Sequence, residues 1–172
     1  MMYAPAPDTF LLAECASKYS GAWALEIGVG SGAVAEELAA NFENVAGTDI
    51  DLPSLAYCRS RNRKLMLVCC DAASAFSHVK FDLAVANPPY LPDDSEKDAT
   101  VHGGPTGVET TIHFIESALP LLSERGAMLV IVSSRADQSA LDAFLAKRGL
   151  KKKMVKEKRL FFERLSVLEL TF

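Results

Sequence analysis

LEIGVGSG, residues 25–32, leads from an apolar run into a loop of alternating glycines. Residues 23–27 predict a buried strand, and residues 33–40, rich in helix formers, predict a helix directly after the loop. Glycines let the backbone turn tightly and approach a ligand closely. The spacing also approximates the G-x-G-x-x-G fingerprint of dinucleotide-binding loops, with Ala33 at its third position. The stretch therefore predicts the first unit of an α/β sheet, with a ligand at the loop.

Strands and helices continue to alternate along the chain. Further strands are predicted at 44–49, 64–70, 81–86 and 127–132, and further helices at 10–19, 52–62, 108–122 and 138–147. Residues 151–172 predict two final strands, an antiparallel hairpin at one side. We therefore expect a Rossmann-like α/β fold with a mainly parallel seven-stranded sheet, helices on both faces and one domain over residues 1–172.

Composition and charge exclude several classes of protein. The formal net charge is −4, so no positive field attracts polyanions. No apolar run approaches the roughly 18–20 residues that cross a bilayer, and no basic segment precedes the N-terminal apolar stretch. The four cysteines form no CxxC pair, which predicts reduced thiols and no metal site. We expect a cytoplasmic protein that binds neither membranes nor metals.

Three acidic residues end three neighbouring strands of the predicted sheet, namely Glu26, Asp49 and Asp71. The carboxyl ends of parallel strands lie along one crevice, so these side chains would share a ligand. Glu26 would repel a pyrophosphate at the glycine loop but suits the amino group and sulfonium of S-adenosylmethionine. Asp49 would accept hydrogen bonds from two ribose hydroxyls, and Asp71 from the adenine amino group.

ANPPYLPDD, residues 86–94, ends the predicted strand at 81–86, because adjacent prolines cannot donate to a sheet ladder. The Asn87 side-chain carbonyl and the Pro88 backbone carbonyl are two acceptors for one planar NH₂ group. Tyr90 adds a flat face for stacking. A nitrogen with a delocalised lone pair is a poor nucleophile, and accepting hydrogen bonds from both its N–H groups raises its electron density. The motif predicts methyl transfer to an amide or arylamine nitrogen through positioning and electrostatics.

LEIGVGSG, GTDID, CCDA and VANPPY, in this order, resemble the class I S-adenosylmethionine-dependent methyltransferases that modify planar nitrogens. YAPAPDTFLLAEC, NPPYLPDD and GGPTGVETTIHFIESALPLLSERGAMLVIV resemble more narrowly the short HemK-like branch of archaea and eukaryotes. That branch methylates the glutamine in the Gly-Gly-Gln motif of class 1 translation release factors. Its catalytic subunit often pairs with a small zinc-binding activator that covers apolar surface. The resemblance implies the same activity, cofactor (product S-adenosylhomocysteine) and partners for this chain.

The resemblance also implies roles for individual residues. At the cofactor it implies Thr9, Glu26, Gly28, Gly30, Asp49, Ile50, Asp71, Ala72 and Asn87. At the acceptor it implies Asn87, Pro88 and Tyr90 as catalytic residues, with Pro89 and Tyr90 contacting the substrate. The chain departs from the family at Val101 and His102, where small or aromatic residues are expected at the substrate rim.

Other functions stay open at this point. Adenine-N6 methylation of nucleic acid uses the same motif, but the basic cluster within 151–159 is typical of a guarded edge strand, and no recognition region is present. Lysine methylation is another alternative, because the acids Asp93, Asp94 and Glu96 would dock a basic peptide. A solvated loop also explains these acids. A regulatory subunit without catalysis usually lacks the acceptor motif. The loop at 91–107 is long enough to suggest a function, and His113 is interpreted as structural.

Overall fold

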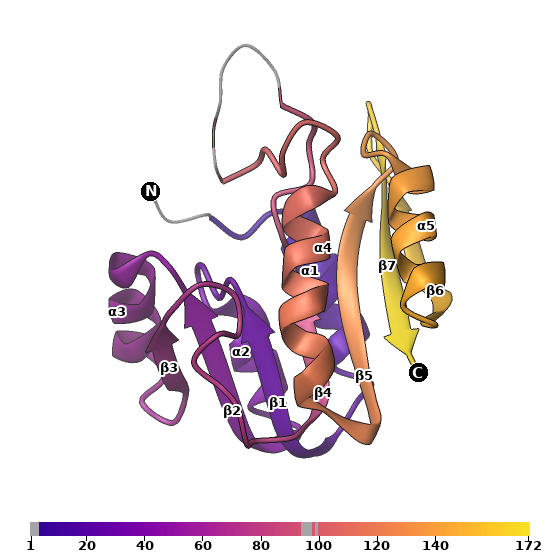
Figure 1. Ribbon diagram of the computed structural model, residues 1–172. Coiled ribbons are helices and arrows are strands. Elements are labelled where there is room, and N and C mark those ends of the chain that lie inside the picture. Colours follow the sequence, from indigo (N-terminus) through magenta and orange to yellow (C-terminus); the bar gives the residue numbers. More distant parts are fainter. Residues whose placement is uncertain (1–3, 94–97, 99) are drawn as a thin grey trace.

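The computed structural model describes residues 4–93, 98 and 100–172 (Figure 1). The elements in chain order are α1 (Pro7–Ala16), β1 (Gly21–Ile27), α2 (Ala33–Leu38), β2 (Phe42–Asp49), α3 (Leu52–Arg61), β3 (Met66–Cys69), β4 (Phe81–Ala86), α4 (Glu109–Ala118), η1 (Leu119–Leu121), β5 (Leu122–Ser133), α5 (Gln138–Lys147), β6 (Lys151–Arg159) and β7 (Arg164–Thr171). In the described part of the chain, no helix is long and apolar enough to cross a bilayer.

One seven-stranded sheet forms the centre of the molecule, with strand order β3-β2-β1-β4-β5-β7-β6. The first five strands in this order are parallel, and β7 runs antiparallel to both β5 and β6. The prediction of a mainly parallel sheet with an antiparallel hairpin at one side is confirmed. Because β1, β2 and β4 are parallel neighbours, the residues that follow them meet at one edge.

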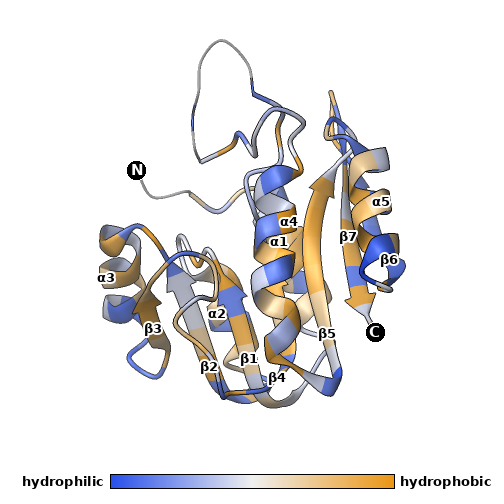
Figure 2. Cartoon of the chain, viewed as in Figure 1, coloured by the Kyte–Doolittle hydropathy of each residue, from blue (hydrophilic) through white to orange (hydrophobic). Residues whose placement is uncertain are grey.

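Both faces of the central strands are buried, which explains their continuous apolar sequences. Leu83 and Val85 of β4 pack in one core cluster with residues of α1, α2 and α3. Ala84 and Ala86 pack in another with residues of α4 and α5. In Figure 2 strand β5 is coloured mostly as hydrophobic, and hydrophilic residues lie towards the outside of the molecule.

Helix α1 begins three residues earlier than predicted. Asp8 and Thr9, which precede the predicted helix at 10–19, lie inside its first turn, because Pro7 suits the first helical position. The backbone N–H of Ala6, the actual N-cap residue, donates to Thr9 Oγ1 at 3.2 Å. The shift buries Asp8 and Thr9, which a solvated cap would have left exposed.

The predicted helix at 108–122 ends at Ala118, and a short 3₁₀ turn containing Pro120 follows it. Strand β5 begins at Leu122, five residues before its prediction, because Leu122 pairs with Phe81 of β4. Strand β3 is shorter than predicted and ends at Cys69, so Asp71 lies beyond the strand.

Candidate active site

A cavity of about 620 Å³ opens at the carboxyl ends of β1, β2 and β4, a volume ordinary for a small-molecule site. Most of the residues expected at a cofactor line it: Gly28, Gly30, Asp49, Ile50, Asp71, Ala72 and Asn87. Thr48, Asp51, Ser54, Thr110, His113 and Phe114 line it as well. The sheet thus brings together residues that lie up to 87 positions apart, from Ile27 to Phe114.

The glycine loop turns directly over the end of β2. The N–H groups of Gly28 and Val29 both donate to the Thr48 carbonyl, at 2.9 and 2.8 Å. Gly28 has φ +74°, a left-handed conformation that a side chain disfavours. A Cβ there would also lie 3.4 Å from the Phe114 ring. Glycine therefore keeps the floor of the cavity clear between the loop and α4.

Asp49 holds this loop in place. Its Oδ2 accepts from the Gly30 N–H at 2.9 Å, and its Oδ1 accepts from the Asp51 N–H at 2.8 Å. Each carboxylate oxygen has a second lone pair, which remains available to a ligand hydroxyl. The same side chain can thus shape the loop and bind a ribose, and only the second role was predicted from sequence.

Glu26, near the end of β1, is only 4% exposed and is not among the residues that line the cavity. Its Oε2 has no hydrogen-bond partner among the described residues. Burial raises the pKa of this carboxyl well above its ordinary value, against a lowering by a backbone hydrogen bond from Ala35. The negative charge of Asp49 raises the pKa further. A buried carboxylate with an unused acceptor fits a ligand that brings a positive amino group.

Helix α4 contributes a wall of the cavity that the sequence prediction missed. His113 Nε2 and Asp71 Oδ1 lie 2.8 Å apart, and both residues line the cavity. Thr110, His113 and Phe114 all line the cavity, at the i, i+3, i+4 spacing of one helix face. That spacing, directly after a glycine-rich loop, was the available signal.

Ile50 and Ala72 lie where the resemblance expected contacts to the cofactor. Ile50 is 76% exposed, an apolar side chain ready to cover a flat ring. Ala72 has φ +44°, the only positive value for a residue other than glycine in the described part of the chain. Strain of this kind is concentrated at functional sites.

The Asn-Pro-Pro-Tyr turn separates this large cavity from a smaller one of about 70 Å³. Asn87 lines both cavities, and Pro88 and Tyr90 line the smaller one. Asn87 Oδ1 is buried and without a hydrogen-bond partner in the residues that the structure describes. A buried amide oxygen left open between two cavities is suited to receive an N–H donor from a ligand.

Tyr90 is hydrogen-bonded to the first turn of helix α1. Its hydroxyl donates to Asp8 Oδ2 at 2.9 Å, while Asp8 Oδ1 accepts from the Thr9 N–H at 2.6 Å. Asp8 is buried and lines the smaller cavity. Thr9 was expected over the cofactor, but the structure places it in the first turn of α1, off the lining of both cavities.

A second loop with glycines, around Gly103, is hydrogen-bonded to Leu91, which directly follows the Asn-Pro-Pro-Tyr motif. Leu91 donates to the Val101 carbonyl at 2.9 Å, and Gly103 donates to the Leu91 carbonyl at 2.8 Å. A Cβ at Gly103 would lie 2.3 Å from the Pro89 carbonyl oxygen, so only glycine fits. His102 lines the large cavity. Part of the segment at 91–107 is therefore a support for the acceptor motif.

Two further sequence-based expectations concern acids and metals. Asp94 and Glu96, two of the acids considered for docking a basic peptide, lie outside the described residues. Within the described ranges, no group of three or more histidine, cysteine or acidic side chains is arranged to hold a metal ion.

Comparisons with known proteins agree with this geometry. A family model described as a methyltransferase domain matches residues 25–88, from the end of β1 into the acceptor motif. Among solved structures, a chain of the Mtq2–Trm112 complex of E. cuniculi has a TM-score of 0.82 at 23% identity, covering 99% of this chain and 98% of that one. The chain has the fold of class I methyltransferases. The E. cuniculi complex is described as responsible for methylation of the eRF1 translation termination factor.

Curated relatives of this chain carry related names. A candidate protein N5-glutamine methyltransferase of Methanocaldococcus jannaschii is 29% identical, over 97% of this chain and 90% of that protein. A release factor glutamine methyltransferase of Moorella thermoacetica is 30% identical over 68% of this chain. The match covers 48% of the Moorella protein, about half of its length.

Proposed function

We propose that this methyltransferase transfers a methyl group from S-adenosylmethionine to the side-chain amide of glutamine in the Gly-Gly-Gln motif of a class 1 release factor. The observation that carries the proposal is Asn87 Oδ1, a buried and unused acceptor between the large cavity and the small one. The names of the curated relatives support glutamine as the acceptor. A release factor is a cytoplasmic substrate, so the proposal places the chain in the cytoplasm.

The volume and the lining of the large cavity support S-adenosylmethionine as the cofactor. Glu26 Oε2 and Thr48 Oγ1 are buried acceptors that have no partner in the described ranges, and Glu26 would receive the amino group. Asp49 would accept from the ribose, with Ile50 and Ala72 beside the adenine. When bound, this cofactor supplies a methyl group on a positively charged sulfonium.

The residues of the chain then act on the acceptor. The Asn87 side chain and the Pro88 carbonyl would accept the two amide N–H hydrogens, which raises electron density on the nitrogen. Tyr90, fixed through Asp8, would hold the amide plane in line for transfer. The new N–C bond forms with the electron pair of the nitrogen as the bond from carbon to sulfur breaks. The amide nitrogen then releases one proton to water, which yields the N-methyl amide.

A lysine acceptor is the second candidate, favoured by one specific observation. Asp8 and Glu163 both line the small cavity, and two carboxylates would attract an ammonium group. Methylation of lysine would also require loss of a proton before transfer, since the ammonium has no lone pair. The planar two-acceptor arrangement suits an amide better, so glutamine is ranked first.

The basic residues of β6 do not favour nucleic acid. Strand β6 is the edge of the sheet, separated from β4 by β5 and β7. Lys152 pairs with Asp142 and Lys156 with Glu14, so part of this charge is neutralised locally. Lysines along an edge strand protect it from unwanted pairing, as the sequence suggested.

We further propose that a small partner subunit, of the zinc-binding activator type, covers the opposite edge at β3. This strand is short and its edge carries no lysine, and Met66 on it and Leu52 at the start of α3 are exposed apolar side chains. Figure 1 shows β3 and α3 together at one side of the molecule. An apolar edge strand is a template for a partner. A Met66→Lys variant should lose co-purification with such a subunit and keep its own fold by circular dichroism.

The test of the reaction is methyl transfer from tritiated S-adenosylmethionine to four acceptors: a class 1 release factor, its Gly-Gly-Gln variant with the glutamine replaced by alanine, a lysine-rich protein and DNA. The proposal expects label in the first acceptor alone. Label in the lysine-rich protein would move the assignment to lysine, and label in DNA would refute a protein substrate.

A further inference from the structure

The turn between β6 and β7 exposes two adjacent phenylalanine rings. Phe161 is 92% exposed and Phe162 is 84% exposed. Their ring centroids lie 4.7 Å apart at an interplanar angle of 81°, an edge-to-face pair. Neither ring contributes to the two core clusters of the described residues. Two large apolar side chains in water at one tight turn are unusual unless they contact a partner.

The turn is firmly anchored, so the position of the pair is defined. Leu160 donates to the Glu163 carbonyl at 2.8 Å, which closes the turn. The Glu163 carboxylate accepts from the Ser133 hydroxyl at the end of β5. Ser134 donates to the Arg164 carbonyl at 2.9 Å, and Arg164 donates to Ser134 Oγ at 3.0 Å. The turn is thus fastened to the end of β5.

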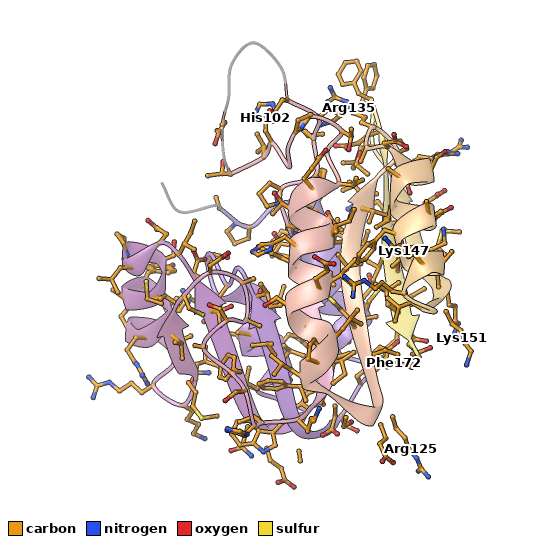
Figure 3. All side chains as sticks on the ribbon, viewed as in Figure 1. His102, Arg125, Arg135, Lys147, Lys151 and Phe172 are labelled. Carbon is orange, nitrogen blue, oxygen red and sulfur yellow. The ribbon has the colours of Figure 1, made fainter. Side chains whose placement is uncertain are left out.

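The same turn borders the acceptor site. Because β7 is antiparallel to β5, with Leu165 paired to Ser133, the turn lies at the carboxyl edge where the crevice opens. Glu163 itself lines the small cavity together with Asn87 and Tyr90. The phenylalanine pair is therefore adjacent in sequence to a wall of the acceptor cavity. In Figure 3 this end carries the labels His102 and Arg135, and Phe172 is at the opposite end.

We propose that Phe161 and Phe162 form a docking element for the protein that presents the acceptor side chain, an inference that rests on the proposed function. A polypeptide whose glutamine enters the small cavity must pass next to Glu163, and its neighbouring surface then meets the two rings. Exposed aromatic residues at the rim of a site are typical anchors of protein interfaces. The preferred partner surface is apolar, with acidic residues on the side that meets Lys158 and Arg159, which precede the pair in sequence.

The test measures the affinity of the whole protein, saturated with S-adenosylhomocysteine, for a fluorescently labelled class 1 release factor. The F161S/F162S variant should bind the factor about 30-fold or more weakly, as expected for loss of interface anchors. Its affinity for S-adenosylhomocysteine should stay within about twofold, because neither ring lines the cofactor cavity. The F161Y/F162Y variant, which keeps both rings, should restore binding. If the double variant fails to fold, the single variant F162S is measured in the same way.

Phe172→Ser provides the matched control. Phe172 is also an exposed phenylalanine of this hairpin, 57% exposed, and it follows β7 at the end of the hairpin opposite to the β6–β7 turn. It should leave the affinity for the release factor unchanged.

Each remaining outcome is decisive. Equal affinity of F161S/F162S and wild type would overturn the docking role alone. Wild-type protein that binds the factor through these rings but transfers no methyl group would refute the proposed function and leave the docking surface standing. If the rings bind anionic phosphatidylserine vesicles and not the release factor, the surface is a membrane contact, and the inference is overturned.

Discussion

Replacing Glu26 by glutamine removes one negative charge and keeps the shape of the side chain. The structure predicts opposite effects of this change on folding and on cofactor binding. Without ligand, the buried Glu26 carboxylate has an oxygen with no partner among the described residues. Its pKa in the folded protein is raised, chiefly by burial, well above the ordinary value of 4.5. With S-adenosylmethionine bound, the same oxygen is expected to receive the amino group of the ligand.

The sign of the folding effect follows from the direction of this pKa shift. Because the folded state keeps its proton to a higher pH than the unfolded state, the Glu26 contribution to stability is largest below the unfolded pKa. It is lost as pH rises from there through the raised folded pKa. Ligand-free Glu26→Gln should therefore be more stable than wild type at neutral and alkaline pH, and it should lose this part of the pH dependence.

The binding effect has the opposite sign. A hydrogen bond to a charged group contributes about 1.5–3 kcal/mol. Loss of the carboxylate should therefore weaken S-adenosylhomocysteine binding by roughly 10- to 150-fold, since about 1.4 kcal/mol corresponds to a factor of ten. Isothermal titration calorimetry measures this affinity, and chemical denaturation from pH 5 to 9 measures the ligand-free stability.

Glu36→Gln is the matched control, because Glu36 lies on α2, faces solvent more and pairs with Arg61. It should change stability by no more than about 0.5 kcal/mol, as a surface ion pair does, and leave the affinity unchanged. The reasoning about Glu26 is refuted if the glutamine variant binds S-adenosylhomocysteine as tightly as wild type. A variant that is less stable at pH 8 than wild type would refute the pKa argument.

Three further substitutions test the acceptor side. Asn87→Ala should lower kcat at least about 100-fold, as loss of a preorganised hydrogen-bonding group does, with S-adenosylhomocysteine affinity reduced only a few-fold; equal turnover would remove Asn87 from the mechanism. Two groups, the Tyr90 hydroxyl and the Thr9 N–H, donate to the two carboxylate oxygens of Asp8, and Asp8→Asn keeps only one of these oxygens. Tyr90 should then be misplaced, so kcat should fall about tenfold while the affinity for the cofactor stays unchanged. Gly103→Ala places a Cβ 2.3 Å from the Pro89 carbonyl oxygen and should lower both thermal stability and turnover. A melting curve and the tritium assay measure the two effects. An unchanged melting temperature would show that the loop shifts to accept the Cβ.

Much of the fold could be predicted from the order of short apolar runs and helical segments. Residues 81–86 and 138–147 match β4 and α5 completely, because an adjacent proline pair ends the strand and Asp137 caps the helix. The predicted bounds failed where tertiary pairing or a cap outweighed local pattern. Strand β5 extends back to Leu122 because β4 offers a partner there, and α1 begins at Pro7.

The sequence alone indicated the candidate site residues that belong to local motifs. A glycine loop after a strand, acids at strand ends and Asn-Pro-Pro-Tyr are short local patterns, so the order of residues was enough to name them as candidates for the site. What only the tertiary structure decided are the contacts between distant segments: His113 on Asp71, Asp8 on Tyr90, and Glu163 in the wall beside Asn87. The physical reason is the strand order of the sheet. It places the starts of α1 and α4 and the β6–β7 turn around one crevice, and no local pattern records which distant side chains will meet there.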